Sequence, residues 1–166
     1  MVLLALWSAS HDLLRLTVTD SKKPAATLGS TIVASETDLI QSFLDCDAFA
    51  VVGASNDMRK YGAKVFSCYR QHDREVYPVN PARETVQGAR SHPTLTSIPR
   101  KVEAISIITP PDATEEVVED AHEAGARYLW MQPGAESVAA VDRARELGME
   151  VIAGGPCILV VMGYRE

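Results

Sequence analysis

From residue 36 onward the chain alternates between short apolar runs and longer segments whose apolar residues recur at helical spacing. A short apolar run bounded by glycine, proline or polar residues is typical of a strand that is buried on both faces of a parallel sheet. Five such runs predict strands at residues 48–55, 74–81, 102–111, 126–134 and 149–155. Each strand is followed by turn-forming residues, so the strand ends are expected to carry loops.

Segments with a period of 3.6 residues predict helices at residues 35–46, 60–73, 112–125 and 136–148. Strands and helices then follow one another in strict alternation. This order predicts an α/β fold of the doubly wound, Rossmann-like type, with a five-stranded parallel sheet and helices on both faces.

Two details of the pattern concern the ends of elements. Asp112 and Glu115 have the spacing of a capping box, and Gly125 stands where a helix commonly ends. The segment 84–101, with turns expected at its glycine and prolines, is interpreted as a loop.

The chain is predicted to have one domain, residues 36–166, preceded by an N-terminal extension of unclear structure, residues 1–35. The extension is apolar but lacks the basic start of a secretory signal, and it is too acidic for an ordinary mitochondrial presequence. The three cysteines of the whole chain, Cys46, Cys68 and Cys157, form no C-x-x-C pair, which favours a reducing compartment. A cytoplasmic location is expected, and a mitochondrial one stays open.

The formal net charge of -6 argues against a broad nucleic-acid surface, because binding to a phosphate backbone requires clustered lysine and arginine. It leaves room for a local pocket that binds one small anion. No apolar run approaches the roughly 20 residues that span a bilayer, so no membrane association is expected.

The loop after the first strand, GASNDMRKYG, is the best candidate for such a pocket. Ser55 replaces the second glycine of the dinucleotide fingerprint, and Gly62 comes later than the third would. Small residues before a helix let an anion approach backbone N–H groups, and Arg59 and Lys60 add positive charge. The alternative is a tight turn with solvated cations.

The loop after the second strand offers Asn80, Pro81 and Arg83, with no acid at its tip to hold a ribose diol. Arg83 suits a ribose that carries a phosphate, as in NADP or coenzyme A, or it is a plain loop cation. Cys157 follows the last strand and is interpreted as a buried structural residue. No histidine spacing indicates a metal site, and no catalytic cluster is recognisable.

Taken together, the motifs VVGAS…KYG, VYPVNP, ITPP, LWMQPGAES and GGPCIL resemble the small stand-alone CoA-binding domain family. That family is similar to the amino-terminal domain of the succinyl-CoA synthetase alpha subunit. The resemblance covers roughly residues 38–159. It implies a coenzyme A site formed by Gly53, Ala54, Ser55, Asn56, Lys60, Tyr61, Gly62, Asn80, Pro81, Arg83, Thr109, Pro110, Pro111, Gln132, Pro133 and Gly134.

Within that implied site, the first loop holds the phosphates, Thr109 flanks the adenosine and Gln132 lies near the pantetheine end. Pro156 stands where relatives often carry a glutamate before the late cysteine, and the synthetase's phosphohistidine domain is not expected here. The chain is therefore predicted to bind coenzyme A or an acyl-CoA without catalysis of its own.

Two alternatives remain. An NADP-dependent oxidoreductase agrees with the fold and with Arg83. Against it, neither a Tyr-x-x-x-Lys motif nor a comparable proton donor is apparent near the strand ends. A ligandless interaction module would use the apolar VLLALW segment as a partner surface, and a protein partner or homo-oligomer stays open in every case.

Overall fold

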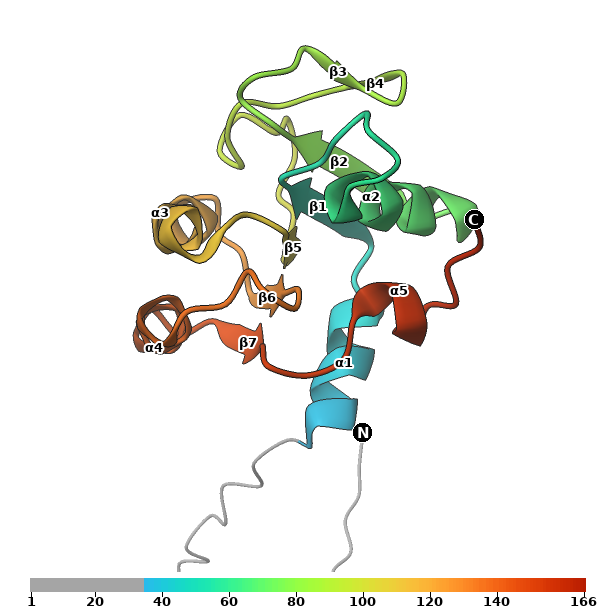
Figure 1. The fold of residues 1–166 in the computed structure, drawn as a ribbon. Helices are drawn as coiled ribbons and strands as arrows, with labels where there is room; N and C mark the ends of the chain where they lie inside the picture. Colours follow the sequence, from blue (N-terminus) through green and yellow to red (C-terminus); the bar gives the residue numbers. More distant parts are fainter. Residues whose placement is uncertain (1–34) are drawn as a thin grey trace, which may run out of the picture. The chain divides into compact units, whose positions relative to one another are not determined.

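The computed structural model describes residues 35–166, so the predicted extension lies, apart from its last residue, outside the described residues. The described part is built on one parallel sheet of five strands in the order β2-β1-β5-β6-β7 (Figure 1). These strands are β1 (Ala48–Val52), β2 (Glu75–Val79), β5 (Ala104–Ile107), β6 (Tyr128–Met131) and β7 (Glu150–Ile152). The predicted fold class is confirmed.

The helices cover both faces of this sheet. They are α1 (Glu36–Leu44), α2 (Tyr61–Gln71), α3 (Pro111–Glu123), α4 (Val138–Glu146) and α5 (Ile158–Val161). Figure 1 shows α3 and α4 on one face and α1, α2 and α5 on the other. Side chains alternate along each strand, so every central strand contributes to two cores.

The two cores are visible in β1. Ala50 and Val52 pack in the core with residues of α3 and α4, whereas Phe49 and Val51 pack in the core with residues of α1 and α2. All five residues of β1 are buried, which explains why its sequence is a continuous apolar run and does not alternate with polar residues.

The strand order reverses next to β1. The chain passes from β1 through α2 to β2 on one side, and then returns to β5 on the other side of β1. The crevice at the carboxyl ends of β1 and β5 is therefore the topological switch point, where ligands bind in open parallel sheets.

The start of α3 differs from the prediction. Pro110 is the N-cap, Pro111 is the first helical residue, and no side chain caps the helix, so the capping box of Asp112 and Glu115 is wrong. Proline is favoured at a first helical position because its φ is already helical and it lacks an N–H that would need a partner. Glu115 instead accepts a hydrogen bond from the Ser137 hydroxyl at 3.1 Å.

The segment interpreted as a loop contains a small antiparallel hairpin, β3 (Thr85–Val86) and β4 (Ala89–Arg90). Its turn residues Gln87 and Gly88 both have positive φ, +49° and +81°. A two-residue turn with positive φ at both positions matches the twist of a hairpin. The hairpin was missed because each strand has only two residues, too few for a periodic pattern.

The sheet has a protected edge at β2. Pro78 lies in this edge strand and has no N–H group to offer. Its carbonyl accepts a hydrogen bond from the backbone N–H of His92 at 2.9 Å, and the His92 carbonyl accepts one from Asn80 at 2.9 Å. The outer side of β2 is thus occupied by the segment that follows the hairpin.

Two features are absent from residues 35–166. No described helix has the length and apolar character needed to cross a membrane. No group of three or more His, Cys, Asp or Glu residues in this range is arranged to hold a metal ion.

Candidate functional site

The strand-end loops enclose a cavity of about 610 Å³ beside the switch point. It lies between the end of β1, the start of α2 and the loops that follow β5 and β6. Its lining consists of Gly53, Arg59, Lys60, Tyr61, Gly62, Ile108, Thr109, Pro110, Pro111, Gln132, Pro133, Gly134 and Ala135. The structure therefore brings most of the predicted site residues together at one place.

A second cavity of about 560 Å³ continues from the first, because Gly53 and Thr109 line both. It lies between the ends of β1 and β2 and the side of α3. Asn80 and Pro81 from the second predicted loop line it, together with apolar residues such as Val79. The two cavities form one elongated crevice with Gly53 at its middle.

Arg83 lies outside this crevice. It lines a third hollow of about 520 Å³ with Arg90, which belongs to β4. Asn80 and Pro81 are shared between this hollow and the second cavity. Arg83 is thus next to the crevice and not in it, and sequence analysis did not find Arg90, because the hairpin that carries it was interpreted as a loop.

Gly53 and Gly62 let the helix start come close to the sheet. Gly53 has a φ of +88°, which a side chain would strain. A Cβ on Gly62 would lie 1.9 Å from the Gly53 carbonyl oxygen, so only glycine is compatible with this backbone. The spacing of these two glycines departs from the dinucleotide fingerprint, yet it produces the same close contact of helix and strand.

Several backbone donors of the first loop and of the start of α2 have no partner within residues 35–166, and two of them, on Tyr61 and Gly62, belong to residues that line the first cavity. The N–H groups of Ala54, Ser55, Tyr61 and Gly62 donate no hydrogen bond to any residue in the described part of the chain. Lys60, the N-cap of α2, makes no side-chain capping bond either. Free N–H groups at a helix start, together with the positive end of the helix dipole, attract an anion.

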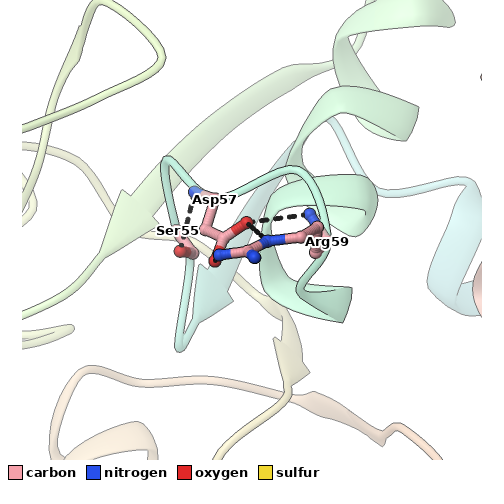
Figure 2. Close-up of polar contacts among 3 residues, drawn as sticks. All are labelled: Ser55, Asp57 and Arg59. Carbon is pink, nitrogen blue, oxygen red and sulfur yellow. Dashed lines mark hydrogen bonds and ion pairs between the residues drawn. The ribbon is translucent and has the colours of Figure 1, made fainter.

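Arg59 differs from its expected role as a free cation (Figure 2). Its guanidinium donates to both carboxylate oxygens of Asp57, at 2.9 Å each. The Asp57 N–H donates in turn to Oγ of Ser55 at 3.1 Å. The bound guanidinium holds the pKa of Asp57 below its usual value, so this carboxylate stays charged and neutralises Arg59. Lys60 remains as the loop's other cation.

Asn56 was predicted to contact the phosphates, but its amide is engaged by the hairpin. Its Nδ2 donates to the Thr85 carbonyl at 3.0 Å, and its Oδ1 accepts from the Gln87 N–H at 2.6 Å. The Gln87 side chain donates to the Ala63 carbonyl at 2.9 Å. Gln87 therefore joins the hairpin, the first loop and α2, and sequence analysis did not identify it.

Asn80 also holds two loops together. Its Nδ2 donates a 2.7 Å hydrogen bond to the carbonyl of Ala54. Ala54 is fully buried, so its own atoms are not exposed at the surface. The hydrogen bond from Asn80 joins the first and second predicted loops.

Gln132 is 1% exposed at the end of β6. Its Oε1 accepts a hydrogen bond from the Ile158 N–H at 3.0 Å, at the start of α5. Its Nε2 has no hydrogen-bond partner among the described residues. The neighbouring Cys157 is half-buried, and the Pro156 carbonyl accepts a bond from Trp130 Nε1 at 3.0 Å. The loop after β7 is thereby packed against the end of β6.

The sequence model for the CoA binding domain matches residues 47–163, most of the described part of the chain. The chain belongs to the CoA binding domain family. The family expected from the motifs is confirmed.

Several known proteins are similar to it. The alpha subunit of acetate–CoA ligase (ADP-forming) II from Pyrococcus furiosus is 31% identical over 90 residues, 54% of this chain and 20% of that subunit. A hypothetical protein from Pyrococcus horikoshii has a TM-score of 0.71 at 30% identity, covering 76% of this chain and 88% of that one.

A third similar structure is that of the dinucleotide forming acetyl-coenzyme A synthetase 1 from Ca. Korarchaeum cryptofilum, in complex with phosphate and ADP. Its TM-score is 0.59 at 31% identity, and the match covers 66% of this chain and 25% of that chain. This CoA binding domain thus spans only about a fifth to a quarter of the two larger proteins. It spans most of the P. horikoshii protein.

Proposed function

We propose that this chain binds coenzyme A or an acyl-CoA in the elongated crevice at the carboxyl edge of its sheet. The observation that carries the proposal is the pair of unpartnered N–H groups of Tyr61 and Gly62, at the start of α2, in the wall of the cavity that shares Gly53 with the second one. A pyrophosphate at this helix start would accept hydrogen bonds from backbone donors, with Lys60 beside it.

The two cavities suit the two ends of such a ligand. The cavity between β2 and α3 has Val52, Val79 and Val117 in its walls, which suit the flat face of an adenine ring. Its lining also includes the acidic residues Glu116, Asp120 and Glu123. The cavity towards β6 is lined by Ile108, Pro110 and Pro111 and suits the narrow pantetheine arm. Arg83 and Arg90 would face a phosphate carried by the ribose.

We propose further that residues 35–166 contribute the binding and that a reaction would require protein parts beyond them. The supporting fact is that the match to the acetate–CoA ligase subunit covers only a fifth of its length. A protein partner is consistent with this reading. Residues 35–166 supply the binding part alone.

A thermal-unfolding panel with CoA, acetyl-CoA, NADP, NAD and ATP tests the proposal. At 100 times its dissociation constant a ligand stabilises the folded state by about 2.7 kcal/mol, a shift that is easy to measure. Stabilisation by the CoA species alone supports the proposal. Stabilisation by NADP alone would favour the oxidoreductase, and no response to any ligand would favour the interaction module.

A pair of variants at Ser55 locates the binding site. Ser55→Trp places a large side chain in the loop and should abolish stabilisation by CoA. Ser55→Ala removes only the hydroxyl that accepts from Asp57 at 3.1 Å, so it should retain most of the binding. Equal CoA affinity in Ser55→Trp and the unchanged protein would remove this loop from the site.

A further inference from the structure

The amide of Gln132 has a fixed orientation and one unused donor. The Ile158 N–H can only donate, so the atom that it contacts at 3.0 Å must be the amide oxygen. The Nε2 group is therefore the other end of the amide. It is buried and has no partner among residues 35–166.

Such a group is costly in an isolated protein. Nearly all buried polar side-chain atoms have at least one partner, and a buried donor without one loses the hydration that it had in water. Met131, which precedes it, is also 1% exposed, so Gln132 lies at the depth of core residues. A polar residue with an unused donor at this depth indicates a partner that is not part of the described chain.

Gln132 lines the cavity that runs from Gly53 towards β6. The strands β1 and β6 are separated only by β5, so their ends lie about 10 Å apart at the usual strand spacing. A flexible chain that starts from an anion at Gly53 can reach this distance. The neighbouring walls are Pro110, Pro111 and Pro133, which offer no N–H groups of their own.

We propose that Nε2 of Gln132 donates a hydrogen bond to a carbonyl oxygen of the ligand's arm, either a pantetheine amide or the thioester of an acyl group. A neutral amide donor in an apolar setting matches a neutral acceptor, and a thiol is a weak acceptor by comparison. The inference rests on the proposed function, because it specifies what one end of that same crevice recognises.

Two variants separate the donor from the fold. Gln132→Glu keeps an oxygen that accepts from the Ile158 N–H, and because burial favours the protonated carboxyl, its O–H can still donate, so this variant should retain most of the binding. Gln132→Met keeps the length of the side chain and removes both polar groups. Unfolding midpoints of the two unliganded variants, compared with the unchanged protein, check that each one folds.

The dissociation constants of both variants are then measured by calorimetry for CoA, acetyl-CoA and adenosine 3′,5′-bisphosphate. The bisphosphate shares the nucleotide but has no pantetheine arm. In Gln132→Met, loss of the hydrogen bond should weaken the binding of CoA or acetyl-CoA, which carry the pantetheine arm, by up to about tenfold in the dissociation constant. The affinity for the bisphosphate should stay within about twofold, because its contacts are elsewhere in the crevice.

The pattern of losses identifies the acceptor. Equal weakening of CoA and acetyl-CoA supports a pantetheine carbonyl, and weakening of acetyl-CoA alone supports the thioester carbonyl. Unchanged affinities in Gln132→Met, or an equal loss for the bisphosphate, would overturn the role of Gln132 while leaving the proposed function intact. If the unchanged protein binds none of the three ligands, both proposals fail.

Discussion

The backbone N–H of Gln87 donates a 2.6 Å hydrogen bond to Oδ1 of Asn56, across 31 positions of the sequence. This bond attaches the turn of the β3–β4 hairpin to the loop that follows β1. The Gln87 side chain extends the attachment to α2 through the Ala63 carbonyl and the Ser67 hydroxyl, which donates to Gln87 Oε1 at 2.7 Å. The hairpin thus holds the candidate phosphate loop from its outer side.

Removing the Asn56 amide should loosen this attachment. Asn56→Ala deletes the bonds to the hairpin and is expected to lower the free energy of unfolding by about 1–3 kcal/mol. Asn56→Asp is the matched control, since it keeps an acceptor for the Gln87 N–H and loses only the donor to Thr85. Denaturant titration measures the stabilities, and hydrogen exchange at the Gln87 amide should be faster in Asn56→Ala than in Asn56→Asp.

Gly62 is expected to be the least replaceable residue of the site. In Gly62→Ala the new Cβ would lie 1.9 Å from the Gly53 carbonyl oxygen, so either α2 or the loop must move. We expect a loss of about 3 kcal/mol or more in the free energy of unfolding.

Gly148→Ala serves as the control for Gly62→Ala. Gly148 has a φ of +81°, and a Cβ there would meet nothing within 4 Å, so its cost comes from backbone strain alone. That strain is about 1–2 kcal/mol. A Gly62→Ala protein as stable as Gly148→Ala would contradict the close helix–strand contact.

The pair of Asp57 and Arg59 gives a prediction about charge. Asp57→Asn releases the Arg59 guanidinium from its carboxylate and should strengthen CoA binding by up to about fivefold, because a cavity-lining cation becomes available to a phosphate. Arg59→Ala leaves the Asp57 charge uncompensated and should weaken binding by a similar factor.

Calorimetry at low and high salt checks both Asp57→Asn and Arg59→Ala. The two effects should shrink as salt increases, because the pair is exposed to solvent. The double variant should bind almost as well as the unchanged protein. If Arg59→Ala strengthens binding, the interpretation of this pair is wrong.

Cys68 gives a prediction about alkaline stability. Burial, with a further contribution from Cys157, raises the pKa of its thiol from 9.0 to about 11. The unfolded chain therefore loses this proton first as the pH rises, so the stabilising contribution is complete below pH 9 and disappears between pH 9 and 11.

Comparison with Cys68→Ala isolates this contribution. Tyr69, whose pKa burial also raises, contributes to the alkaline loss in both proteins and cancels in the difference. The stability advantage of the unchanged protein over Cys68→Ala should shrink across that interval. Parallel stability curves from pH 8 to pH 11 would exclude a role for Cys68.

Most of the fold was predictable because its strands are buried on both faces. The run from Phe49 to Val52 can be recognised from its apolar composition alone, and Gly125 ends α3 as predicted, with a φ of +77°. The start of α3 was not predictable in the same way. Asp112 and Glu115 satisfy a capping pattern, but the two prolines before them fix where the helix begins.

The site was predictable where it depends on the backbone at strand ends. Gly53, Thr109 and Gln132 come together because parallel strands place their carboxyl ends at one edge. The roles of Asn56 and Arg59 were not predictable, because their partners decide them. Asn56 is hydrogen-bonded to Thr85 and Gln87, which are 29 and 31 positions away in the sequence. Arg59 is bound by the carboxylate of Asp57, two residues before it, which could equally have faced solvent.

Pro78 and His92 have a consequence for assembly. A parallel or antiparallel sheet grows between molecules when an edge strand offers free N–H and carbonyl groups to a strand of its neighbour. At β2 the proline supplies no N–H, and the segment at His92 already occupies the carbonyls of the strand's end. At this end of β2 a strand of another molecule cannot join the sheet, so a protein that approaches here must bind through side chains.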